Sequence, residues 1–248
     1  MARTRRTEKA IIEDVALEVA GADSVEAFVV RPADGSKPKA GSLWLHWLGE
    51  HHNDRSQLLP EAIALAGRGV RSVLPAGRLP WRAPPKDAET DVASLELEGR
   101  RLDRAFEELL AGLSAKAPVA MVGHDFGAMH GLGLLAREKR IGSAVLIAGV
   151  PRWADWFLPF WPIAGDAIDY RRALEPFDPI RAVARTNAEL LFQFSRRDFY
   201  IAPMTARELT RAAGRDVGLE WYEADHAMRS SRARASRTAF LERHLKLG

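Results

Sequence analysis

Residues 119–128 constrain the fold of this chain more than any other segment. A run that suits a buried strand, 119–124, ends in a Gly-x-Asp-x-Gly pattern, and small residues that suit a helix follow at once. A side chain on such a sharp turn needs small neighbours, because the backbone folds back on itself. Gly123 and Gly127 supply them. The pattern predicts a nucleophile elbow with Asp125 in the position of the nucleophile.

Strands and helices alternate along most of the chain, which predicts the α/β class. Helices are expected over residues 87–111, 126–137, 203–213 and 229–245. The inner strands are apolar on both faces, as in a parallel sheet that helices cover on both sides; they are 42–47, 70–75, 119–124, 143–148, 189–195 and 219–223.

Two further strands precede this alternation. Residues 11–20 and 24–31 favour β-structure and have turn residues between them, so we expect a hairpin at an antiparallel edge of the sheet. The prediction is therefore an eight-stranded, mostly parallel sheet. We find no internal repeat and no low-complexity linker, so we expect one domain over residues 1–248.

One connection is too long for a simple crossover. Residues 150–187 number 38, whereas a crossover with its helix needs roughly 12. This segment is rich in aromatic residues, namely Trp153, Trp156, Phe157, Phe160, Trp161 and Tyr170. We expect a small cap insert at the carboxyl edge of the sheet, where ligands bind in open α/β folds. Most of its aromatic side chains should pack, and one or two should line the pocket.

The other members of a catalytic triad should follow the elbow in the order acid, then histidine. Asp198 follows the strand 189–195, and His226 follows the strand 219–223. Three loops at strand ends would then bring Asp125, Asp198 and His226 together. Asp155 is the alternative acid.

The loop 46–49, with the sequence His-Trp-Leu-Gly, follows an earlier strand and is placed to complete an oxyanion hole. The backbone N–H of Phe126, directly after the expected nucleophile, is the first donor. We expect the N–H of Leu48 to be the second, with Trp47 and Gly49 as alternatives. Substrate contacts are expected from His46, Trp47, Trp153, Trp156 and Tyr170.

With these residues the chain resembles the α/β-hydrolase superfamily over nearly its whole length. The segment 123–128 is similar to the elbow of epoxide hydrolases and of haloalkane or haloacid dehalogenases. In that group the elbow aspartate is the nucleophile, and the resemblance implies this role for Asp125. The compact body and the segment 177–179 look more like dienelactone-hydrolase-type members, whose nucleophile is cysteine or serine.

The chain departs from the aspartate group in three ways. Its oxyanion loop has His-Trp-Leu-Gly where His-Gly-x-Pro is usual. Epoxide hydrolases protonate the epoxide oxygen with cap tyrosines, and only Tyr170 lies in the expected insert. Fluoroacetate dehalogenases hold the substrate carboxylate with arginines just after the nucleophile, where this chain has Phe126 and Met129.

The aspartate determines the expected chemistry. A carboxylate with a reference pKa near 3.9 is ionised at neutral pH, so Asp125 can displace a leaving group from carbon and form an alkyl ester. His226, oriented by Asp198, would then deprotonate the water that hydrolyses this ester. A halide would need N–H donors such as Trp47, Trp153 or Trp156, and an epoxide would need an acid such as Tyr170.

Two other functions stay open. In an esterase or lactonase, His226 would activate water directly and Asp125 would position it. A catalytically silent binding protein would keep only the fold. The esterase or lactonase would act on a small-molecule carboxylic ester.

Composition limits the remaining classes. With no cysteine, the chain has no disulfide, thiolate metal site or cysteine nucleophile. His51, His52 and Asp54 form a short cluster without further support, so we expect no metal, and we expect no cofactor. The basic residues 1–9 precede no apolar stretch, and the absence of cysteine suits a reducing compartment, so we expect a cytoplasmic protein.

Charge and hydropathy add the last expectations. Residues 226–248 contain six arginines and lysines and one glutamate. Cations are favoured near the C-terminus of a helix, so we interpret them as the solvated face of a final helix and expect no nucleic-acid partner. The longest apolar run, 144–150, is far shorter than the ~20 residues of a membrane span. Whether two copies form a homodimer stays open.

Overall fold

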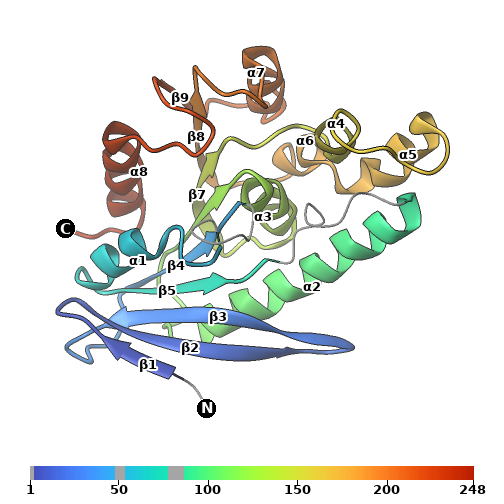
Figure 1. Cartoon of the computed structure of the whole chain (residues 1–248). Coiled ribbons are helices and arrows are strands. Elements are labelled where there is room, and N and C mark those ends of the chain that lie inside the picture. The colour runs from blue at the N-terminus through green and yellow to red at the C-terminus, as the bar shows by residue number, and fades with distance from the viewer. Residues whose placement is uncertain (1–2, 48–53, 78–86) are drawn as a thin grey trace.

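The computed structural model describes residues 3–47, 54–77 and 87–248, and these build one continuous sheet with helices on both faces (Figure 1). The strand order is β1-β2-β3-β5-β4-β6-β7-β8-β9. The pairs from β5 to β9 are parallel and the three pairs from β1 to β5 are antiparallel. The predicted α/β class and mostly parallel sheet are confirmed.

The antiparallel edge contains the expected hairpin. Strands β2 (Ala10–Val19) and β3 (Ala22–Pro32) pair with Ala10 opposite Pro32. The predicted count of eight strands is wrong, because β1 (Arg3–Arg6) adds a ninth in the described part of the chain. Every residue of β1 is exposed, and three are arginines, so it has no apolar alternation to reveal it. Such charge also discourages pairing of this open edge with another chain.

The parallel strands form the buried centre of the sheet. They are β4 (Ala40–Leu45), β5 (Val70–Pro75), β6 (Val119–His124), β7 (Ile141–Ile147), β8 (Glu189–Ser195) and β9 (Gly218–Tyr222). All residues of β4 and β6 are buried, as expected for strands that helices cover on both faces. Gly41 of β4 is in register with Val119 of β6, and Leu45 with Gly123.

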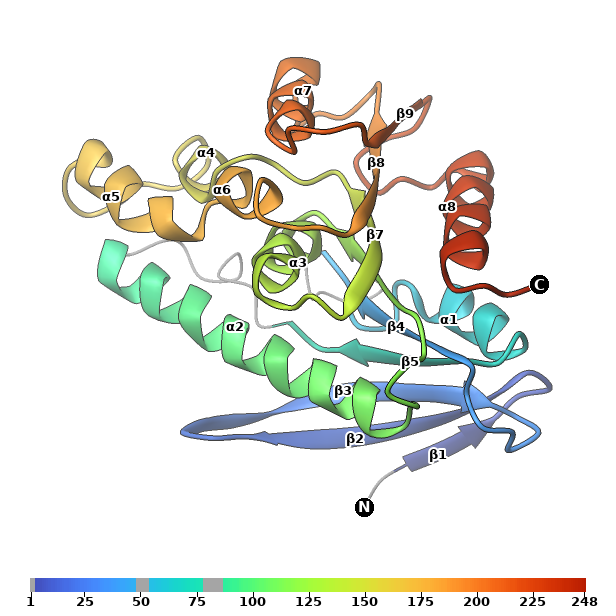
Figure 2. The ribbon, with the colours of Figure 1, turned by 180° about the vertical axis from the view of Figure 1, so that it is seen from behind.

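Helices cover both faces of this sheet. Helices α1 (Leu59–Ala66) and α8 (Ser231–His244) lie on one face, and α2 (Ala88–Ala111) and α3 (Phe126–Arg137) lie on the other (Figures 1 and 2). Asp87 caps the N-terminus of α2, because its side chain accepts a hydrogen bond of 2.7 Å from the N–H of Thr90.

The insert between β7 and β8 is helical. It contains α4 (Trp153–Phe157), α5 (Ala167–Leu174), a 3-10 turn (Glu175–Phe177) and α6 (Pro179–Val183), and α7 (Pro203–Arg211) follows β8. Its helices lie beside α3 and the start of α2 (Figure 1). Most of its aromatic side chains are buried, as expected, and those of Trp153, Trp156 and Phe157 contact Phe126 of α3.

A buried ion pair joins the two helices on the first face. Arg237 of α8 donates to both carboxylate oxygens of Glu61 of α1, at 2.5 and 2.7 Å, and both side chains are buried. The prediction of a purely solvated basic face is therefore wrong for Arg237. An isolated buried guanidinium is costly, and the two-pronged contact with Glu61 compensates for its lost hydration.

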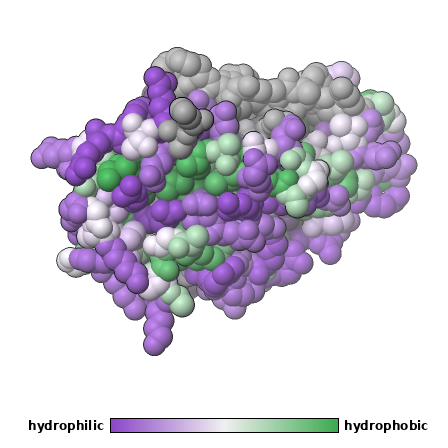
Figure 3. All heavy atoms as spheres, turned by 90° about the horizontal axis from the view of Figure 1, so that it is seen from below, coloured by the Kyte–Doolittle hydropathy of each residue, from purple (hydrophilic) through white to green (hydrophobic). Residues whose placement is uncertain are grey.

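The surface around the antiparallel edge is mostly polar. Viewed from below, hydrophilic residues cover most of this face, with separate apolar patches between them (Figure 3). Across residues 3–47, 54–77 and 87–248, no helix combines the length and the apolar character that crossing a membrane requires.

Candidate active site

Asp125 lies on a strained turn between β6 and α3. Its backbone has φ 52° and ψ −114°, a conformation that non-glycine residues rarely adopt. The turn is held by its neighbours, because the N–H of Asp125 donates to Ile147 at 2.7 Å and its carbonyl accepts from Met129 at 3.0 Å. The sequence-predicted elbow is therefore present, and it places the carboxylate at the carboxyl edge of the sheet.

The two glycines of the elbow have no room for a side chain. A Cβ atom on Gly123 would lie 2.5 Å from the carbonyl oxygen of Gly127. One on Gly127 would clash with the carbonyl oxygens of Leu45 and His46, the latter at 2.5 Å. Real Cβ atoms do not approach backbone so closely, so both positions require glycine.

The structure brings the three predicted triad residues together. The Nε2 atom of His226 lies 3.6 Å from Oδ2 of Asp125, and its Nδ1 atom lies 2.9 Å from Oδ2 of Asp198. Asp198 is itself fixed, because its Oδ1 atom accepts from the N–H groups of Tyr200 and Ile201. All three side chains are almost completely buried.

Burial and mutual charge shift the ionisation of the pair. Loss of hydration raises the pKa of Asp125, against the lowering effect of His226 and of the N–H of Phe126. For His226, burial lowers the pKa, but the hydrogen bond to Asp198 and the charge attraction of Asp125 and Asp198 outweigh it and raise the pKa to about 9. The two acidic neighbours therefore favour the protonated form of His226.

A second hydrogen-bond network, which sequence reasoning missed, supports the loop of His226. The side-chain amide of Gln57 donates to Nδ1 of His124 at 2.7 Å, and Nε2–H of His124 donates to the carbonyl of His226 at 2.9 Å. Burial holds the pKa of His124 well below its usual value, so the ring is neutral and both roles are defined. The Oε1 atom of Gln57 accepts from the N–H of Trp47 at 3.2 Å.

Aromatic rings surround His226. Its ring centroid lies 5.0 Å from that of Trp47, 5.9 Å from that of Trp156 and 5.1 Å from that of Tyr200. The indole N–H groups of Trp47 and Trp156 are buried and have no hydrogen-bond partner among the residues that the structure describes. Trp47 and Trp156 thus lie where substrate contacts were expected, and Tyr200 joins them.

Three other candidate residues face elsewhere. The hydroxyl of Tyr170 donates to Asp91 of α2 at 2.8 Å, and burial raises the pKa of that phenol. The indole N–H of Trp153 donates to the carbonyl of Phe177 at 3.0 Å. Asp155 pairs with Arg152 and Arg171 on the surface, so it is not the acid that contacts His226.

The oxyanion loop is described only in part. Leu48 and Gly49 lie outside the described residues, so the expected second donor stays a prediction. The N–H of Trp47, one alternative, is already bound by Gln57. His46 is buried and its Nε2 atom accepts from the N–H of Gly77 at 2.8 Å. Phe126 is the first residue of α3, so its N–H lies at the N-terminus of a helix, where the helix dipole favours negative charge.

No cluster of three or more histidine or acidic side chains suited to a metal occurs within the described ranges. His51 and His52 lie outside them.

Several solved structures are similar to this chain in fold. An acetyl xylan esterase from Paenibacillus sp. R4 superposes with a TM-score of 0.78 at 16% identity, covering 98% of this chain and 88% of its own. A cold-adapted esterase from an Arctic intertidal metagenomic library gives 0.71 at 17% identity, covering 98% and 97%. An acylaminoacyl peptidase from Pyrococcus horikoshii gives 0.71 at 14%, covering 97% and 42%.

No protein-family model matches the chain, and no curated protein does either. At these identities the structural likeness establishes the fold alone. The chain has the α/β-hydrolase fold, as its elbow predicts.

Proposed function

We propose that the chain is a hydrolase in which Asp125 attacks a saturated carbon of a small halogenated alkane or epoxide and forms an alkyl ester. The observation that supports this most is the buried carboxylate of Asp125, 3.6 Å from Nε2 of His226, whose Nδ1 atom lies 2.9 Å from Asp198. A carboxylate stripped of water is a stronger nucleophile than a hydrated one, and the elbow presents it at a strand end.

In the first step an oxygen of Asp125 forms a bond to the carbon while the bond to the leaving group breaks, and the leaving group takes the electron pair. The ester that results has no charge. Asp125 thereby loses the negative charge that helps to keep His226 protonated. The pKa of His226 therefore falls, and its proton is released with the leaving group.

In the second step His226 is a neutral base, still oriented by Asp198. It takes a proton from water, and the hydroxide attacks the carbonyl carbon of the Asp125 ester. The N–H of Phe126 stabilises the tetrahedral oxyanion. Collapse breaks the bond between the carbonyl carbon and the alkoxy oxygen, and the alcohol leaves with the proton from His226.

The surroundings of His226 suit either leaving group. The buried indole N–H groups of Trp47 and Trp156 are donors for a departing halide. The ring of Tyr200 contacts His226, so its phenol takes the place of Tyr170 as the acid for an epoxide oxygen.

Ester hydrolysis is the second candidate, and the esterases among the similar structures favour it. In that reaction His226 would have to activate water while Asp125 stays ionised. The ionised Asp125 keeps His226 protonated, so this route needs alkaline pH, near or above a pKa of about 9.

Trapping the covalent ester tests the proposal. His226→Gln is incubated with 1-bromobutane or styrene oxide and weighed intact, with Asp125→Asn/His226→Gln as the matched control. We expect one alkyl group on the first protein and none on the second. Absence of any adduct, together with turnover of p-nitrophenyl esters by the wild type, would support the esterase. Inactivity towards the whole panel would favour a binding protein.

A further inference from the structure

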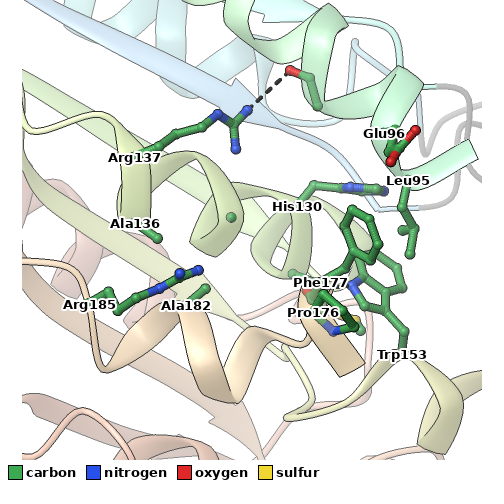
Figure 4. A pocket seen from close by; sticks show the side chains of 13 residues that line it. Leu95, Glu96, His130, Ala136, Arg137, Trp153, Pro176, Phe177, Ala182 and Arg185 are labelled. Carbon is green, nitrogen blue, oxygen red and sulfur yellow. Dashed lines mark hydrogen bonds between the residues drawn. The ribbon is translucent and has the colours of Figure 1, made fainter. Parts of the chain in front are cut away.

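We propose that the cavity between α2, α3 and the insert is a second binding site, distinct from the triad, for a small carboxylate with an apolar or aromatic body (Figure 4). The cavity has a volume of about 270 Å³. Ligand sites usually measure roughly 300–1,000 Å³, so the occupant is a small molecule.

One end of the cavity is apolar and aromatic. Leu95 of α2, Trp153 of α4 and Phe177 line it, and their side chains gather at the same end in Figure 4. The indole of Trp153 is fixed by its bond to Phe177 and by its ring contacts, so this end is a rigid wall. It suits an alkyl chain or a phenyl ring.

Two glycines leave the middle of the cavity open. A Cβ atom on Gly133 of α3 would meet only Nη1 of Arg137, at 3.7 Å, and one on Gly99 of α2 would meet only Nη2 of Arg137, at 3.8 Å. Close packing of the helices therefore does not require these glycines. Glycine is the least favourable non-proline residue in a helix interior, so its use here points to the open space itself.

The other end is cationic. Arg137 and Arg185 both line the cavity and lie at its far end from Trp153 (Figure 4). Arg137 is held in place by Asp103, to which its Nε and Nη2 atoms donate at 2.9 and 2.7 Å, and its Nη1 atom lies over Gly133. Because Nη2 also donates to the carbonyl of Gly99, at 3.1 Å, the Nη1 atom is the one that can donate a charge-assisted hydrogen bond to a ligand carboxylate.

The acidic groups near the cavity offset the charge of Arg137 but not that of Arg185. Glu96 lines the cavity beside Leu95, at the apolar end (Figure 4), and Asp103 already pairs with Arg137. Lys139 adds a further cation close by, where it donates to the carbonyls of Ala136 and Arg185. An anion is therefore favoured at the arginine end.

His130 provides a polar group inside the cavity. It is buried, contacts Trp153 with a ring separation of 4.6 Å, and its Nε2 atom has no hydrogen-bond partner in the part of the chain that is described. Burial lowers the pKa of His130 to about 3, so the ring is neutral and can pair with a carbonyl or hydroxyl group of a ligand.

The cavity is separate from the triad, although ring contacts connect the two. Phe126 contacts Trp153, which lines the cavity, and Trp156, which contacts His226. Neither Asp125 nor His226 lines the cavity. Occupancy of the site could thus be measured by binding alone, whatever reaction the triad performs.

Binding of 4-phenylbutyrate, measured by saturation-transfer NMR and titration, tests the proposal. We expect binding to the wild type, with loss of about tenfold or more in affinity for Arg185→Ala, since one charge-assisted contact is removed. Gly133→Leu, which fills the middle of the cavity, should abolish binding. Arg211→Ala, an exposed arginine on α7, is the matched control and should bind like the wild type.

One further ligand and one further variant make the result decisive. The neutral amide of 4-phenylbutyrate should bind at least about tenfold more weakly, and Asp125→Asn/His226→Gln should bind the acid normally. No binding by the wild type at millimolar concentration would overturn the proposal. So would binding that survives both Arg185→Ala and Gly133→Leu, or binding that is lost when the triad is changed.

Discussion

The charge on His226 should make the stability of the protein depend on pH in a defined window. Asp125 and Asp198 raise the pKa of His226 from 6.5 to about 9 in the folded protein. Below pH 6.5 the folded and unfolded states both hold the proton, and the stabilisation is complete. As the pH rises above 6.5 the unfolded state loses its proton first, so the free energy of unfolding falls until the pH passes about 9.

The magnitude follows from the size of the pKa change. A difference from 6.5 to about 9, at about 1.4 kcal/mol per pH unit, corresponds to roughly 3 kcal/mol. This is a large share of the roughly 5–15 kcal/mol by which a domain is usually stable. His226 is almost fully buried, so solvent screening reduces the effect little.

Urea denaturation followed by tryptophan fluorescence, from about pH 6 to about pH 9.5, measures this dependence. The reference is Asp125→Asn/His226→Gln, which removes both ionisable groups with side chains of similar shape. We expect the wild type to lose roughly 3 kcal/mol more than the reference across this range. The same loss in both proteins, or a pKa near 6.5 for the His226 ring by NMR, would refute the reasoning.

Two further substitutions test contacts of the structure. Asp198→Asn should lower the turnover rate by about 10⁴-fold, because the amide favours the wrong tautomer of His226, whereas Asp155→Asn should change the rate little. Steady-state rates on the substrate found in the panel check this. A larger loss for Asp155→Asn than for Asp198→Asn would show that the acid is misassigned. Glu61→Gln should lower the free energy of unfolding by about 3–5 kcal/mol, because it leaves Arg237 buried without a charged partner; an unchanged urea midpoint would contradict it.

The sequence predicted the parts that depend on local pattern. The strand 119–124 and the helix 126–137 have the predicted bounds, because the glycines of the elbow mark the turn. The position of Asp125, Asp198 and His226, each just after the end of a predicted parallel strand, was enough to place the three side chains at one edge. This inference is reliable because the carboxyl ends of parallel strands lie at the same edge of the sheet.

Contacts between distant side chains could not be predicted in the same way. The link from Gln57 through His124 to His226 joins residues far apart in the chain, and no sequence pattern indicated it. Tyr170 lies in the insert but faces Asp91, while Tyr200 reaches His226 from the loop after β8. The direction in which such a side chain faces depends on tertiary packing, which the hydrophobic periodicity of the sequence does not predict.

Oxygen transfer from Asp125 is the most direct test of the covalent mechanism. A single turnover of a halogenated alkane or epoxide is run in H₂¹⁸O with protein in excess, and both the product and the peptide that contains Asp125 are weighed. We predict that the first product carries ordinary oxygen from Asp125 and that the label enters the Asp125 carboxylate. Labelled product with an unlabelled Asp125 would contradict the mechanism, because water would then have attacked the substrate itself.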